Sequence, residues 1–223
     1  MVNNILKIEP DERGYFLFNQ NNSRGFRDAE WPEKLDNVIW CIGDSFTVGD
    51  SQPYEETWPK ILEKKISKRC LNLGEDGCSN DTITLRAQEI YNKYKPNLMI
   101  IMWSYFSRRR QNNINVHFSE KSFSILKDVQ NFSQNFKIID KLPITCIHLL
   151  IPNAVIDFNK IGKKLFMKTM LKLTDLTKEQ IAKIIIFPQL DYAKDRHHFS
   201  IKTSELVTNL ITKKITDIDN ESK

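Results

Sequence analysis

Two polar stretches of the 223-residue chain carry residue types that could together perform nucleophilic catalysis. Ser45 stands in a Gly-Asp-Ser turn directly after a short apolar run. Asp195 stands three residues before His198, ahead of the last helical pattern. An imidazole can accept the proton of a serine hydroxyl while a carboxylate orients its ring. These residues are candidates for a nucleophile, a general base and the partner of that base, with His197 as an alternative base.

The turn after the second apolar run could stabilise negative charge. It reads Gly74-Glu75-Asp76-Gly77-Cys78-Ser79. A glycine there permits close backbone approach and can aim an N–H at a developing oxyanion. Gly74 fits a structural role better, and Cys78 has no evident base. Gly77 is the candidate donor, although a glycine of this kind is also common in ordinary turns.

Three blocks of the chain, taken in order, resemble the motifs of the SGNH or GDSL-type hydrolase superfamily. The blocks are Gly43-Asp44-Ser45, Asn72 to Ser79, and Asp195-x-x-His198. The upstream Asn22-Ser23-Arg24-Gly25-Phe26-Arg27-Asp28 and Glu56-Thr57-Trp58-Pro59 resemble a subgroup of that superfamily. The resemblance covers most of residues 22–215.

The resemblance implies a role for each matching residue. Ser45 is implied as the nucleophile, His198 as general base and acid, and Asp195 as the residue that sets the imidazole tautomer. The backbone N–H groups of Gly77 and Ser45 are implied as oxyanion donors. Such chemistry requires neither a metal nor an organic cofactor, and we expect none.

The third block departs from the superfamily pattern. The superfamily places an asparagine after the third strand, where its side chain donates to the oxyanion, but this chain reads Trp103-Ser104-Tyr105-Phe106-Ser107-Arg108. Losing one oxyanion donor typically lowers kcat by about 10²–10³. Ser104, Tyr105 or Arg108 could replace the missing donor. Asp44 and Arg108 are also candidates for binding substrate, although arginine runs are more often solvated.

The elements that must position these residues alternate along the chain. Short apolar runs typical of buried parallel strands cover 38–42, 70–73, 98–103, 144–151 and 184–187, with helical patterns between them. This order predicts a three-layer α/β/α sandwich around a five-stranded parallel sheet, a flavodoxin-like arrangement that SGNH hydrolases share. Ligands of such sheets bind beyond the carboxyl ends of the strands, where the candidate residues fall.

We expect one α/β hydrolase domain over residues 36–217. Residues 1–35 are polar with scattered aromatics and are predicted to form an N-terminal extension packed on that domain. Residues 104–142 are a long connection that is partly helical or serves as a substrate-covering insertion.

Composition excludes several other classes of protein. With 40% hydrophobic and 27% charged residues, the chain fits a globular domain. No apolar run is long enough to cross a bilayer, and the lysine-flanked apolar stripe of 161–173 is more typical of a core helix, so no membrane partner is expected. The net charge of +5 is too small to imply nucleic acid. The four cysteines form no Cys-x-x-Cys pair, and no secretion signal is evident, so we expect a cytoplasmic chain without a metal.

The expected activity is hydrolysis of carboxylic esters through an acyl-enzyme, with O-acetyl groups on carbohydrate as a first substrate class. The partner is then a small-molecule or glycan ester. Two alternatives use the same cleft: a weak or silent glycan-binding module, and an O-acyltransferase. Nucleotide binding by a flavodoxin-like sheet is the weakest alternative, because it leaves Asp195 and His198 unexplained.

Overall fold

The computed structural model describes residues 21–111, 114–116, 124–152, 154 and 168–221 of the chain. In this part, five parallel strands form one sheet in the order β2-β1-β3-β6-β7. The strands are β1 (Ile39–Gly43), β2 (Cys70–Gly74), β3 (Leu98–Trp103), β6 (Thr145–Leu150) and β7 (Ile184–Ile186). Each overlaps an apolar run predicted to be a strand, and the predicted sheet is confirmed.

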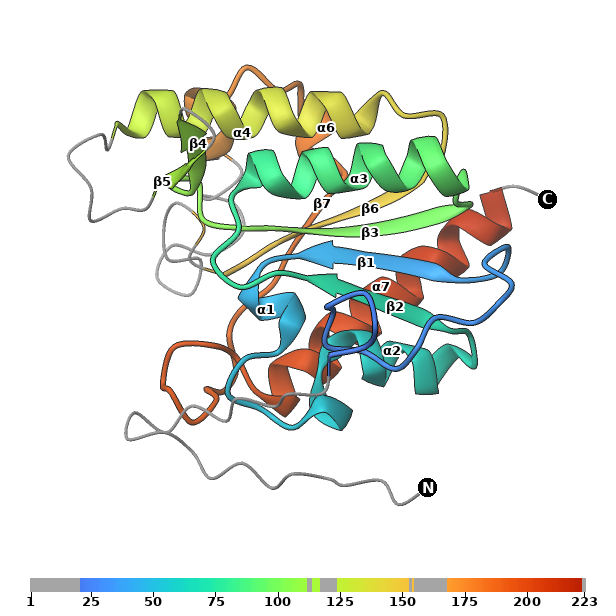
Figure 1. Cartoon of the computed structure of the whole chain (residues 1–223). Helices are drawn as coiled ribbons and strands as arrows, with labels where there is room; N and C mark the ends of the chain where they lie inside the picture. The colour runs from blue at the N-terminus through green and yellow to red at the C-terminus, as the bar shows by residue number, and fades with distance from the viewer. Residues whose placement is uncertain (1–20, 112–113, 117–123, 153, 155–167, 222–223) are drawn as a thin grey trace.

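Helices cover both faces of the sheet and complete the predicted three layers. Figure 1 shows α3 (Asn80–Tyr94) and α4 (Ile125–Asp140) on one face, with α2 (Trp58–Ile66) and α7 (Ile201–Glu221) on the other. The paired helices of each layer contact one another. The shorter helices are α1 (Ser45–Val48), η1 (Tyr54–Glu56) and α6 (Lys178–Ala182). No helix of the described residues is long and apolar enough to span a membrane, and residues 161–167 of the lysine-flanked stripe lie outside this description.

The strand order explains where a ligand site can form. From β1 the chain crosses to β2 on one side, and it later returns to β3 on the other side of β1. The loops that leave β1 and its neighbours therefore diverge at the carboxyl end of β1, which is where ligands of such sheets generally bind. Figure 1 shows α1 and the loop before α7 at this edge of the sheet.

The long connection over 104–142 divides into two parts. Its first part contains the antiparallel strands β4 (Arg109–Gln111) and β5 (Ile114–Val116), while residues 112–113 and 117–123 lie outside the described part. Its second part is helix α4, whose Val129, Phe132, Phe136 and Ile139 are buried in the core. A substrate-covering role can therefore apply only to the residues that precede α4.

The described part of the N-terminal segment packs on the sheet and on α3. The Trp31 ring lies 6.2 Å from the ring of Phe26, 5.1 Å from that of Trp40 and 5.9 Å from that of Tyr94. Trp40 belongs to β1 and is fully buried. The segment thus extends the core next to β1, the strand that precedes Ser45. Residues 1–20 lie outside the described residues.

Candidate active site

Ser45 lies at the first position of α1, immediately beyond the carboxyl end of β1. Two glycines let this short helix sit directly on the sheet edge. A Cβ at Gly43 would lie 2.1 Å from Thr47 Oγ1, and a Cβ at Gly74 would lie 2.4 Å from the backbone nitrogen of Val48. Larger residues at either position would push α1, and Ser45 with it, away from the strands.

The structure brings Ser45, His198 and Asp195 into one hydrogen-bonded series. Ser45 Oγ lies 2.8 Å from His198 Nε2, and His198 Nδ1 lies 2.5 Å from Asp195 Oδ2. Because a carboxylate accepts from Nδ1–H, the Nε2 atom is left to accept the serine proton. Ser45 and His198 are separated by 153 positions in the chain, so only folding makes this contact.

Asp195 orients the histidine loop as well as the imidazole. Its Oδ1 atom accepts the backbone N–H of His197 at 2.8 Å and that of His198 at 3.0 Å. Burial alone would raise the pKa of Asp195, but the hydrogen bond from the His198 side chain and those from the two backbone groups lower it below its ordinary value. An ionised Asp195 is therefore favoured beside the imidazole.

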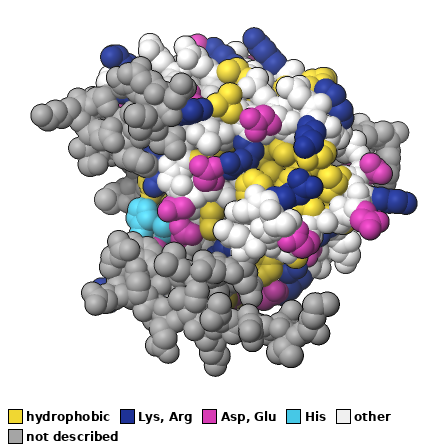
Figure 2. Space-filling view, viewed as in Figure 1, with side chains coloured by type: hydrophobic (Ala, Val, Ile, Leu, Met, Phe, Trp, Pro, Cys, Tyr) yellow, Lys and Arg dark blue, Asp and Glu magenta, His cyan; other side chains and the backbone are white. Residues whose placement is uncertain are grey.

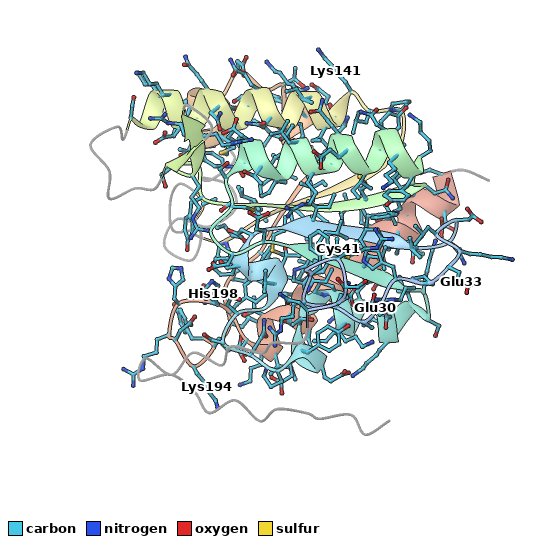
Figure 3. All side chains as sticks on the ribbon, viewed as in Figure 1. Glu30, Glu33, Cys41, Lys141, Lys194 and His198 are labelled. Carbon is cyan, nitrogen blue, oxygen red and sulfur yellow. The ribbon has the colours of Figure 1, made fainter. Side chains whose placement is uncertain are left out.

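His197, the alternative base, points elsewhere. Its Nε2 atom lies 3.2 Å from the hydroxyl of Tyr105, and the residue is exposed. His198 is buried and packs on Phe46, with 4.6 Å between ring centroids. Figure 3 shows His198 in the loop before α7, on the side of the sheet where the strands end. Figure 2 shows histidine side chains reaching the surface at this edge, beside acidic side chains.

The predicted oxyanion donors are available in the described part of the chain. Neither the N–H of Ser45 nor that of Gly77 donates to any other described residue. Gly77 has a φ of +66°, a left-handed conformation that favours glycine, in a turn where the Cys78 N–H donates to the Glu75 carbonyl. Both groups can therefore donate to a ligand.

Asp44 is fully buried next to Ser45 in the turn between β1 and α1. Its Oδ1 accepts the Phe46 N–H at 3.1 Å, and its Oδ2 accepts the Ser104 hydroxyl at 2.5 Å and Arg108 Nη1 at 3.1 Å. Burial raises the pKa of Asp44, while Arg108 and the hydrogen bonds oppose that rise. The Asp44 carboxylate thus contacts Phe46, Ser104 and Arg108 in the interior, and the substrate contact expected for it stays a prediction.

The candidate third-block residues have different surroundings. The Ser104 hydroxyl is engaged with Asp44, and its N–H donates to Asn80 Oδ1 at 2.9 Å. The Tyr105 hydroxyl faces His197. Arg108 lies with its Cζ 5.0 Å from the centre of the Tyr105 ring.

Sequence reasoning missed the residues that hold α1 in place. Arg27 donates to the carbonyls of Val48 at 3.2 Å and Gln52 at 2.8 Å, and also to that of Gly49. Asn72 Nδ2 donates to the Thr47 carbonyl at 2.9 Å. The signal for Arg27 was present in the Asn-Ser-x-Gly-Phe-Arg stretch, but a contact across more than twenty positions cannot be read from spacing.

Asp28 links the same segment to β2. Its carboxylate accepts the Asn72 N–H at 3.0 Å and the Tyr54 hydroxyl at 2.7 Å, and forms an ion pair with Arg69 at 2.8 Å. Residues 27 and 28 therefore fasten the N-terminal segment to α1 and to the strand beside it.

The described residues contain no cluster of three or more histidine, cysteine or acidic side chains that could hold a metal ion. Cys78, the rival nucleophile, is buried, and its thiol donates to the Gly43 carbonyl at 3.4 Å. Burial raises the pKa of this thiol well above its ordinary value, which disfavours the nucleophilic thiolate.

A hydrogen-bonded serine, histidine and aspartate at the strand ends of a three-layer α/β fold define a hydrolase-like architecture. No protein-family model matches the chain, and no curated protein sequence matches it significantly. Solved structures do match. Psychrotrophic esterase EstA from Pseudoalteromonas sp. is 18% identical with a TM-score of 0.52, and the match covers 83% of this chain and 100% of that chain.

Two further solved structures match to a similar degree. A lipolytic protein of the G-D-S-L family from Desulfitobacterium hafniense is 17% identical, with a TM-score of 0.53 and coverage of 80% and 99%. A family two carbohydrate esterase from Clostridium thermocellum, solved with cellohexaose, is 17% identical, with a TM-score of 0.52 and coverage of 86% and 67%. The chain therefore has the fold of the SGNH or GDSL-type hydrolases.

Proposed function

We propose that this chain is a serine esterase that hydrolyses carboxylic esters through an acyl-enzyme. The observation that carries the proposal is the series from Ser45 Oγ through the His198 ring to Asp195, with separations of 2.8 and 2.5 Å. A serine whose hydroxyl contacts an imidazole oriented by a carboxylate is an activated nucleophile. The fold shared with esterases supports the same conclusion.

In the first half-reaction, Ser45 Oγ attacks the ester carbonyl carbon and its proton passes to His198 Nε2. The carbonyl electron pair moves to oxygen, where the N–H groups of Ser45 and Gly77 stabilise the charge. When the intermediate collapses, the ester C–O bond breaks. His198 gives its proton to the departing oxygen, which leaves as the alcohol, and Asp195 stabilises the imidazolium meanwhile.

In the second half-reaction, His198 takes a proton from water as the water oxygen attacks the acyl carbon. Collapse of this second intermediate breaks the bond to Ser45 Oγ, and the proton on His198 returns to that oxygen. The carboxylic acid leaves and the enzyme is restored. No redox change occurs, and water is the only co-substrate.

We propose O-acetyl groups on carbohydrate as the first substrate class to test. The support is the similar fold of a carbohydrate esterase that binds cellohexaose. The half-buried Tyr105 and the exposed His197, whose ring centroids lie 6.1 Å apart with an interplanar angle of 28°, offer an aromatic surface near Ser45 on which a sugar ring can stack.

A second candidate function is a glycan-binding module that does not hydrolyse its ligand. The absence of an asparagine after β3 favours it, because an incomplete oxyanion site slows acyl transfer. Diversion of the acyl group from water to an added alcohol would instead indicate an acyltransferase.

The test is labelling with a small fluorophosphonate, followed by intact-mass spectrometry and peptide mapping. We expect one adduct at Ser45 in the wild type, none in Ser45→Ala, and labelling slowed by at least about 10³-fold in His198→Ala. His197→Ala is the matched control and should label at close to the wild-type rate. Failure of the folded wild type to label would refute the esterase and favour the binding module, to be examined next with glycan arrays.

A further inference from the structure

The loop after β3 must supply whatever replaces the missing asparagine side chain, and two of its three candidates are already engaged. The Ser104 hydroxyl directs its proton at Asp44 Oδ2, 2.5 Å away, because a carboxylate can only accept. The Tyr105 hydroxyl lies 3.2 Å from His197 Nε2, toward the exposed rim. Arg108 remains.

One edge of the Arg108 guanidinium is held by hydrogen bonds, and the other edge keeps N–H groups that can donate to a ligand. Its Nη1 donates to Asp44 Oδ2 at 3.1 Å and lies 3.4 Å from Ser104 Oγ, while Tyr105 lies against its face. Its Nε and Nη2 atoms make no hydrogen bond with any other described residue. A guanidinium has five N–H donors in a rigid plane, so fixing one nitrogen also orients the others.

The backbone places Arg108 beside the Gly77 turn. The Arg108 carbonyl accepts the Asn80 N–H at 3.2 Å, and Asn80 begins α3 directly after that turn. The positive charge of Arg108 also acts on the buried Cys78 thiol, where it opposes the rise of pKa that burial causes. The Arg108 backbone thus lies beside the turn that carries one proposed oxyanion donor, Gly77, and the guanidinium is bonded to Asp44, the residue that precedes the other donor, Ser45.

We propose that Arg108 is the third oxyanion donor of this site and takes the place of the superfamily's asparagine; the inference rests on the esterase proposed above. A free N–H of its guanidinium donates to the oxygen that becomes negative when Ser45 attacks. No proton is transferred and no covalent bond to Arg108 forms.

Asp44 is the reason to prefer this role over capture of an anionic substrate. The buried carboxylate already balances the charge of Arg108, so the pair attracts a bound anion less than a free arginine would. The N–H groups on the free edge of the guanidinium can still form hydrogen bonds, and these become stronger as negative charge develops on the oxyanion. Asp44 acts here as a positioning residue that fixes the guanidinium plane.

The experiment measures kcat and KM for a neutral acetyl ester and for an ester of equal size that carries a carboxylate. In Arg108→Ala we expect kcat to fall about 10²–10³-fold for both esters, with KM changed less than about threefold. Added guanidinium ion should restore part of kcat. Arg108→Lys should have a lower kcat than Arg108→Ala has with added guanidinium ion, because a lysine ammonium does not reproduce the planar donor geometry of a guanidinium.

Arg110→Ala, in the same arginine run, is the matched control and should retain wild-type rates. Because Arg108→Ala leaves a buried carboxylate unpaired, the double variant Asp44→Asn with Arg108→Ala serves if the single variant is unstable. It should fold and show the same loss of kcat.

The outcomes separate this inference from the esterase proposal. If the wild type neither labels nor hydrolyses esters, the esterase proposal fails. If the wild type is active and folded Arg108→Ala keeps kcat within about threefold, the Arg108 inference alone fails. A rise of KM confined to the carboxylate ester would also overturn it, because that result identifies an anion-binding residue.

Discussion

Asp50 is a partly buried carboxylic acid next to the proposed nucleophile. Its N–H donates to the Ser45 carbonyl at 3.2 Å. Burial is the main cause that raises the pKa of Asp50 to about 6, and repulsion from Asp76 adds to it, while Arg27 and His198 oppose the rise. The carboxyl therefore titrates in a range where an exposed aspartate is already ionised.

The raised pKa of Asp50 predicts a pH-dependent loss of stability. Between pH values of about 4 and 6 the folded chain keeps a proton on Asp50 that the unfolded chain has released. The contribution of Asp50 to the free energy of unfolding therefore falls as the pH rises through this window. Asp50→Asn should raise Tm at pH 7 and leave it nearly unchanged at pH 4.

The measurement is Tm from thermal unfolding at both pH values. Asp36→Asn, at an exposed position shortly before β1, is the control and should change Tm at neither pH. Equal shifts of Tm at both pH values in Asp50→Asn would show that the effect does not come from ionisation.

At the scale of elements, the four-residue helix α1 depends on partners outside itself. A helix this short has almost no stability of its own. Three carbonyls at or beyond its end are satisfied by Arg27, which comes from the N-terminal segment. The position of Ser45, the proposed nucleophile, therefore depends on a segment to which no chemical role is assigned in the proposed reaction.

Arg27→Ala should lower both stability and activity. The loss of these buried hydrogen bonds should reduce the free energy of unfolding by about 3 kcal/mol, because it leaves the carbonyls unsatisfied. A displacement of α1 by about 1 Å should cost about 10²-fold in kcat. Urea unfolding and steady-state kinetics measure the two effects.

Arg24→Ala is the matched control for Arg27. Arg24 comes from the same segment, but it is exposed and lies 4.4 Å over the Trp31 ring. Its removal should cost about 1 kcal/mol or less. If Arg27→Ala reduced stability and activity no more than Arg24→Ala does, the hydrogen bonds from Arg27 would not be needed to hold α1.

At the scale of the whole molecule, the helical part of the long connection belongs to the core. The Phe132 ring of α4 lies 4.1 Å from that of Phe106 and 5.6 Å from that of Trp103, and Phe132 is fully buried. The layer that covers this face of the sheet is thus α3 with α4. A helix buried to this extent cannot move as a lid without unfolding part of the core.

Phe132→Ala should reduce the free energy of unfolding by about 3–5 kcal/mol, because a large cavity is left in a packed interior. Leu126→Ala is the control on the same helix: Leu126 is 63% exposed, so its loss should change stability by less than about 0.5 kcal/mol. Chemical denaturation measures both. A cost below about 1 kcal/mol for Phe132→Ala would mean that α4 is not part of the core.

The order of strands and helices could be predicted from the sequence because it depends on local signals. Runs such as 98–103 are apolar throughout, as a strand covered on both faces must be. Gly43 and Gly74 end their strands in the sequence, and the structure supplies the reason, since a Cβ at either position would meet α1. Ser45, Asp195 and His198 could be selected as candidate site residues because short motifs surround them.

The tertiary structure decided which long-range contacts these residues make. His198, not His197, contacts Ser45, and Asp44 is bonded to Ser104 and Arg108. Arg27 donates to the Gln52 carbonyl beyond the end of α1. Each of these contacts joins segments that are far apart in the chain. Sequence spacing carries no information about such pairs, because they are brought together only when the loops at the strand ends meet. The sequence by itself therefore determined the fold and the residue types of the site, while the packing of loops on the sheet determined how those residues are held.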